Sequence, residues 1–177
     1  MNREDDPTFE FDDEPANQES SILLPWEQQE KKPVISDLLQ TSYHSSQRMT
    51  TLAKSTHRHI SSLKQVRGSV RWQGHEWKWA ITYSHPEIDP HSPASFAYLI
   101  PNPAQLQLVI PINKTMHKAL HETDQLNNRE YLKDAIANAI IPNQYAWPNW
   151  TITNKKHSTQ LIRLIKWKLD FLTNHHK

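Results

Sequence analysis

The chain has 177 residues, of which none is cysteine and only two are glycine, Gly68 and Gly74. The lack of cysteine excludes disulfide bonds, thiolate nucleophiles, and zinc or iron–sulfur sites with cysteine ligands. Two glycines do not suffice for the glycine-rich loops that hold nucleotide phosphates, which argues against the standard nucleotide-binding motifs. No serine or threonine stands in the pattern of an activated nucleophile. We therefore expect no catalytic residue and no cofactor. An enzyme is less expected than a non-catalytic protein.

Long apolar runs are also missing. None approaches the ~20 residues that a membrane-spanning helix requires. The first residues are acidic, whereas a secretory signal peptide begins with basic residues. These two features predict a cytoplasmic protein with no membrane partner.

Charge is distributed very unevenly along the chain. Residues 1–30 hold ten acidic side chains and a single base, Arg3, for a formal charge of −9. The remaining 147 residues hold 19 Lys and Arg and nine Asp and Glu, for a formal charge of +10. A basic body favours anionic partners, and a tethered acidic segment can compete for the same surface.

The sequence divides into an arm, residues 1–33, and a single domain, residues 34–177. Acidic composition, prolines and the lack of apolar periodicity predict that the arm is disordered. Within it, Ile22, Leu23, Leu24 and Trp26 form a short apolar motif. This motif either packs back on the domain or docks a protein partner, because an exposed tryptophan beside three aliphatic residues is unfavourable.

Apolar periodicity predicts the elements of the domain. One or two helices are expected over about 36–67, with Ser36 as N-cap, a break near residues 45–46, and Gly68 as the stop signal. Alternation predicts two hairpins, 69–72 with 76–83 and 96–100 with 105–110. Helices are expected at about 113–121, 127–140 and 155–173, and a fifth strand at 150–153. Trp77 and Trp79 are expected on one strand face, which favours a core role over a stacking role.

This order of elements predicts an α+β fold: a four- to five-stranded antiparallel sheet with helices on one face, preceded by the disordered acidic arm. The runs VRWQGHEWKWAITY, FAYLIPNPAQLQLVIPI and WTITNKKHSTQLIRLIKW, within residues 45–172, resemble the YdhG-like small bacterial domains of unknown function. That resemblance implies a leading helix, a small twisted sheet and a closing helix. The family's suggested relation to iron chaperones would imply an acidic ridge for metal. The body of this chain is basic, so that implication does not carry over.

Two sets of basic residues are candidates for an anion-binding or nucleic-acid-binding surface. Between Arg48 and His75 there are six Lys and Arg and no acidic residue, and a second set lies on the last expected helix. The first set is Arg48, Lys54, Arg58, Lys64, Arg67 and Arg71, and the second is Lys155, Lys156, Arg163, Lys166 and Lys168. Two basic helices beside a tryptophan-bearing sheet are suited to a phosphate backbone. An ordinary solvated helix surface is the alternative.

Histidines and carboxylates provide the metal candidates. His85, Glu87, Asp89 and His91 alternate within seven residues, so an extended chain would project all four to one side. Three nearby prolines favour a solvated connector instead. His117 and His121 are spaced as i and i+4 on an expected helix, where exposed histidines without a ligand are the commoner case.

Three functions stay open at this stage. The first is a non-catalytic binding or adaptor protein whose basic body engages nucleic acid or an anionic protein, while the arm modulates binding or docks a second partner. The second is a metal-dependent enzyme that uses the loop with His85 and His91. The third is a subunit of a homo-oligomer, held together by the apolar motif of the arm.

Overall fold

The computed structural model describes residues 26–43, 46–86, 95–123, 130–141 and 145–175. Within these ranges the chain forms five helices and seven strands. The helices are α1 (Ile35–Thr41), α2 (Gln47–Ser61), α3 (Lys114–Glu122), α4 (Glu130–Ala137) and α5 (Lys155–His175). The strands are β1 (Arg67–Trp72), β2 (Trp79–Ser84), β3 (Ala97–Asn102), β4 (Gln105–Val109), β5 (Ile112–Asn113), β6 (Tyr145–Ala146) and β7 (Asn149–Thr151).

The main sheet is antiparallel and has the strand order β1-β2-β3-β4-β7. The first four strands form the expected meander, and β7 returns to pair with β4, with Leu108 opposite Trp150. A second, two-stranded sheet joins β5 to β6. These short strands contain two residues each, too few to give a periodic signal, and the sequence did not predict them.

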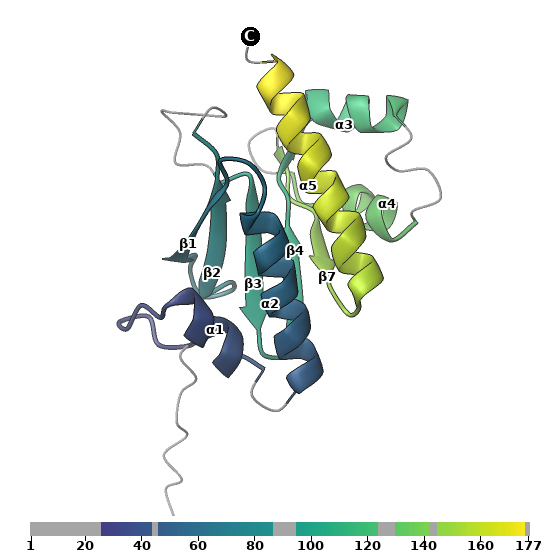
Figure 1. The fold of residues 1–177 in the computed structure, drawn as a ribbon. Helices are drawn as coiled ribbons and strands as arrows, with labels where there is room; N and C mark the ends of the chain where they lie inside the picture. The colour runs from purple at the N-terminus through teal and green to yellow at the C-terminus, as the bar shows by residue number, and fades with distance from the viewer. Residues whose placement is uncertain (1–25, 44–45, 87–94, 124–129, 142–144, 176–177) are drawn as a thin grey trace, which may run out of the picture.

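The helices lie on one face of this sheet. Figure 1 shows α2 and α5 crossing it, with α3 and α4 beside α5. The largest cluster of buried side chains joins helix residues such as Leu52, Ile60 and Leu161 to strand residues such as Ile81 and Leu108. The α+β fold with helices on one face of a five-stranded antiparallel sheet is therefore confirmed.

The first hairpin corrects one expectation about the tryptophans. The loop between β1 and β2 closes with two backbone hydrogen bonds of 2.8 Å, from Gln73 N–H to Lys78 O and from Lys78 N–H to Gly74 O. Lys78 has a φ of 47°, outside the extended region, so the strand alternation breaks at this residue. Trp79 consequently lies in the main core, whereas Trp77 packs in a second cluster made by the other face of the sheet. The expectation that both lie on one face is wrong.

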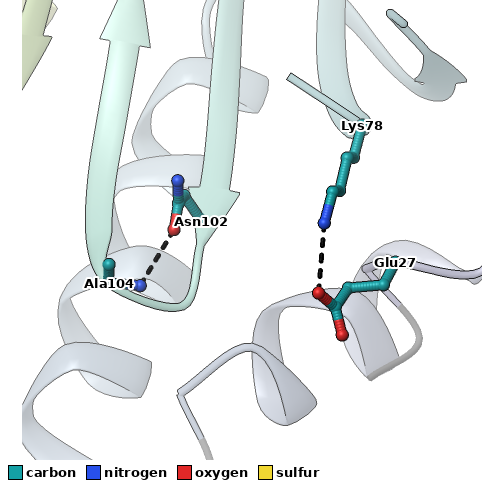
Figure 2. Close-up of polar contacts among 4 residues, drawn as sticks. All are labelled: Glu27, Lys78, Asn102 and Ala104. Carbon is teal, nitrogen blue, oxygen red and sulfur yellow. Dashed lines mark hydrogen bonds and ion pairs between the residues drawn. The ribbon is translucent and has the colours of Figure 1, made fainter. Parts of the chain in front are cut away.

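The second hairpin turns as its sequence predicts. Asn102 ends β3, and its side-chain oxygen accepts a 2.9 Å hydrogen bond from the backbone N–H of Ala104, as Figure 2 shows. An asparagine side chain that bonds the backbone two residues later is a common way to fix a tight turn. This contact sets the register in which Asn102 faces Gln105.

Two signals at helix ends were misassigned. The N-cap of α1 is Val34 rather than Ser36, and it makes no side-chain capping bond. Gly68 does not stop α2, which ends at Ser61, but lies in β1 opposite Tyr83. A Cβ at Gly68 would lie 3.4 Å from ring atoms of both His57 and Tyr83. The glycine there permits a close approach of α2 to the sheet.

The break between α1 and α2 does occur near the expected place. Ser46 caps α2 by accepting a 3.3 Å hydrogen bond from Met49 N–H.

Candidate functional site

The two basic segments predicted from the sequence are brought together by the packing of α2 against α5. Thr56 of α2 and Ser158 of α5 are both buried, and their hydroxyl oxygens lie 2.8 Å apart. At the first turn of α2, Arg48 Nη2 donates a 3.4 Å hydrogen bond to Thr153 O, just before α5 begins. The two helices therefore lie side by side and run in the same direction, as Figure 1 also shows.

The outer side of this helix pair is strongly basic. α2 contains no acidic residue, and Asp170 is the single acidic residue of α5. Most of the predicted cations on the pair are exposed, and Lys54 is half-buried. We refer to eight residues together as the helical basic face: Arg48, Lys54, Arg58, Lys64, Lys155, Lys156, Arg163 and Lys166.

A hollow between α1 and α2 opens beside Lys54 and Arg58 of the helical basic face. It has a volume of about 620 Å³, and its lining includes Lys54, Arg58 and the apolar Ile35 and Leu39. Lys54 Nζ donates a hydrogen bond to the side-chain oxygen of Gln40. Because Arg58 is exposed, its guanidinium is available to an external anion.

His57, also on α2, does not belong to the charged surface. Its Nδ1 lies 2.9 Å from the hydroxyl of the fully buried Tyr83. Burial lowers the pKa of His57 below its usual 6.5. This imidazole is therefore neutral at pH 7 and serves the contact between α2 and the sheet.

Beyond the end of α2, Lys64 extends the helical basic face. Lys64 and Lys166 line one hollow of about 270 Å³ together with His85 and Asp170. The carboxylate of Asp170 places a negative charge at this end. An approaching anion is therefore attracted more strongly toward the part of the face between Arg48 and Arg163.

Arg67 and Arg71 lie on the opposite side of the molecule from this face. In β1 they stand opposite Ser84 and Ala80, and Ala80 belongs to the second cluster, which contains no described helix residue. Cross-strand partners point to the same face of a sheet. Of the eleven cations predicted for an anion-binding surface, eight thus lie on the helical layer and two on the other face of the sheet, and the eleventh, Lys168, is buried.

Lys168 corrects a further expectation, because it is not a surface cation. Its side chain is only 4% exposed, and its Nζ donates a 2.8 Å hydrogen bond to Phe96 O and another to Pro111 O. Burial lowers the pKa of Lys168 from 10.5 to about 7. Helical periodicity places Lys168 on the inner side of α5, where it ties the helix to the ends of β3 and β4.

The apolar motif of the arm lies only partly within the described residues. Ile22, Leu23 and Leu24 fall outside them, whereas Trp26 is 6% exposed in the main core. Lys78 Nζ lies 4.5 Å from the centroid of the Trp26 ring and 3.1 Å from Glu27 Oε1, the latter contact drawn in Figure 2. Trp79 Nε1 donates a 2.8 Å hydrogen bond to Gln28 O. The motif was expected either to pack on the domain or to dock a protein partner. Trp26 packs on its own domain.

The metal candidates gain no support. Glu87, Asp89 and His91 lie outside the described residues, and His85 lines the hollow with Lys64 and Lys166. Within the described ranges no group of three or more His, Cys, Asp or Glu is placed to hold a metal ion. The rings of His117 and His121 are in edge contact, with centroids 4.7 Å apart, and among the described residues this pair has no third metal-ligating side chain in a group with it.

No family model, curated protein or solved structure matches this chain. The resemblance to YdhG-like domains therefore stays an expectation from the sequence. Across the described ranges, no helix has the length and apolar character needed to cross a membrane.

Proposed function

We propose that this protein is a non-catalytic nucleic-acid-binding protein whose helical basic face contacts the phosphate backbone. The observation that carries the proposal is the side-by-side packing of α2 and α5, which joins two basic segments separated by about a hundred residues in the sequence. Neither segment alone offers more than a single row of cations. Together they form a surface two helices wide.

The dimensions of this surface suit a polyanion with regularly spaced charges. With a rise of 1.5 Å per residue, the stretch of α5 from Lys155 to Lys166 is about 17 Å long. Phosphates of one strand repeat about every 3.4 Å along a duplex, so this length corresponds to roughly five phosphates. Contacts of this kind read no sequence, so we expect binding that depends on salt and little on base composition.

The acidic arm is proposed to weaken this binding. Residues 1–25 contain eight acidic side chains and one basic one, a formal charge of −7. The anchoring of Trp26 holds the arm on the domain. A tethered polyanion at high local concentration competes with an external one for the same cations.

Fluorescence anisotropy with a labelled 16-base-pair duplex at low salt tests the proposal. Replacement of Arg48, Arg58 and Arg163 by Gln removes three charges from the helical basic face. Replacement of Lys114, Lys118 and Lys133 by Gln removes three charges from α3 and α4 and is the matched control. The first variant should bind at least about tenfold more weakly, as expected for three lost phosphate contacts, and the control should stay close to the wild type.

Equal losses in both variants would show that only net charge matters and would contradict a defined face. If an acidic polypeptide such as polyglutamate bound and the duplex did not, the partner would be an anionic protein instead.

A further inference from the structure

The face of the sheet opposite the helices carries a cluster of three aromatic rings. Trp77, Tyr98 and Trp147 come from the β1–β2 loop, from β3 and from the segment between β6 and β7. Their ring centroids lie 5.6 Å apart for Trp77 and Tyr98, 5.7 Å for Tyr98 and Trp147, and 6.1 Å for the two tryptophans. Tyr98 is 8% exposed, whereas both tryptophans are only half-buried. Tyr98 thus supports two rings that present part of their surface to solvent.

A hollow of about 390 Å³ adjoins these rings. Its walls are Trp77 and Trp147 together with Gln73, His75 and Glu76. The amide, imidazole and carboxylate groups offer hydrogen-bond donors and acceptors beside two aromatic surfaces. This combination is suited to a flat ring with polar edges, such as a nucleobase.

Charge on this face favours a ligand that is also an anion. Arg67 and Arg71 point to it from β1, and none of the residues in the five strands of the main sheet is acidic. Burial raises the pKa of Tyr98, while hydrogen bonds with Ser95 and, to a smaller extent, the positive charge of Arg71 act in the opposite direction. Glu76 disfavours a phosphate inside the hollow itself. An uncharged base in the hollow avoids repulsion by Glu76, and a phosphate toward Arg71 is attracted by its positive charge.

We propose that this aromatic face binds an unpaired nucleotide of single-stranded nucleic acid. The base lies against Trp77 and Trp147, and the adjoining phosphate lies toward Arg71. Stacking on aromatic side chains beside basic residues is how proteins hold single strands with little sequence preference. The inference rests on the nucleic-acid binding proposed above but uses the other face of the sheet. Bases paired within a duplex are already stacked and cannot enter the hollow.

Indole N–H signals in a ¹⁵N–¹H spectrum of the full chain test this directly. Trp77→Leu and Trp147→Leu variants assign the two signals of interest. A mixed-sequence single-stranded DNA 12-mer should shift both, while a blunt 12-base-pair duplex should leave them in place. The signals of Trp72 and Trp79, which pack on the helix side, are internal controls.

Affinity provides the second measurement. Trp147→Leu should bind the single strand at least about fivefold more weakly, since stacking contributes roughly 1–3 kcal/mol per base. Its affinity for the duplex should be unchanged. Tyr145→Leu is the matched control, because Tyr145 is an exposed aromatic residue two positions away. Thermal melting of each variant shows whether the fold is intact.

The outcomes separate this inference from the proposed function. If the duplex binds and the single strand leaves both indole signals unmoved, the aromatic site is refuted while the helical basic face stands. Equal shifts with single strand and duplex, or shifts with a neutral oligosaccharide alone, also refute it. If neither nucleic acid binds at low salt, both proposals fail together.

Discussion

The hydroxyl oxygens of Thr56 and Ser158 lie 2.8 Å apart in the buried contact between α2 and α5. Thr56 Oγ1 also donates a 2.8 Å hydrogen bond to Leu52 O in its own helix. Two small polar residues at this position let the helices approach closely. The helical basic face depends on that approach, because α2 supplies three of its eight cations and α5 supplies four.

Ser158→Leu should separate the two helices. The added methylene groups have no space beside Thr56, and overpacking of this kind costs about 1–3 kcal/mol. Ser158→Ala is the milder partner variant, with an expected loss of about 1 kcal/mol, because Thr56 keeps its bond to Leu52 O. Urea unfolding measures both losses. Equal and negligible losses would contradict the packing of α2 against α5.

The burial of Lys168 should make the free energy of unfolding increase with pH above about pH 7. In the unfolded chain its pKa is 10.5, and in the folded protein burial lowers it to about 7. Between these values the unfolded state binds more protons, so the free energy of unfolding rises with pH, by at most about 1.4 kcal/mol per pH unit. Below pH 7 both states are protonated, and the contribution of Lys168 is constant and unfavourable.

Urea midpoints at pH 7, 8 and 9 test this, with Lys168→Met as the control. Burial also raises the pKa values of Tyr43, Tyr83 and Tyr131, but their effect begins only near the ordinary tyrosine pKa of about 10. The variant should lose the rise seen in the wild type between pH 7 and 9. A rise of the same size in both proteins would contradict the burial of Lys168.

Trp26 distinguishes an intramolecular from an intermolecular role for the arm. Trp26→Ala removes a buried side chain from the core and should cost about 3–5 kcal/mol. Lys78→Met removes the cation above that ring and its partly exposed pair with Glu27, and should cost about 1 kcal/mol. Light scattering should show the same mass for Trp26→Ala as for the wild type. A fall in mass without a loss of stability would favour contact with a second copy.

Deletion of residues 1–25 should tighten the binding of a DNA duplex. The truncated chain begins at Trp26 and so keeps the contacts of Trp26, Glu27 and Gln28 with the hairpin. It loses a formal charge of −7, and we expect an affinity gain of about tenfold or more at low salt that shrinks as salt screens the arm. A full-length chain in which the eight acids are changed to Asn and Gln should behave like the truncation. A gain in only one of the two would contradict competition by charge.

The sequence predicted the sheet and most helices because their apolar periodicity is strong. The alternation of Leu106 and Leu108 in β4 and the stripe of α5 both depend on local pattern alone. The helical basic face could not be predicted as one surface, because no periodic pattern in the sequence indicates that Thr56 of α2 contacts Ser158 of α5.

Three residues escaped prediction for identifiable reasons. Lys168 looks like a surface cation by type but lies on the inner side of α5. Trp77 leaves the face of Trp79 because Lys78 adopts a positive φ. Trp147 approaches Tyr98 only through the return of β7 to the sheet. Each of these depends on tertiary contacts or on a backbone angle that residue type does not specify.

The salt dependence of duplex binding tests the central claim most directly. The logarithm of the binding constant falls with the logarithm of salt concentration, with a slope of about −0.9 for each phosphate contact in duplex DNA. We expect the wild type to show a slope of several units, and the Arg48, Arg58, Arg163→Gln variant a slope smaller by about 2–3 units. The Lys114, Lys118, Lys133→Gln control should keep the wild-type slope. No binding at low salt, or the same slope in all three proteins, would contradict a nucleic-acid interface on α2 and α5.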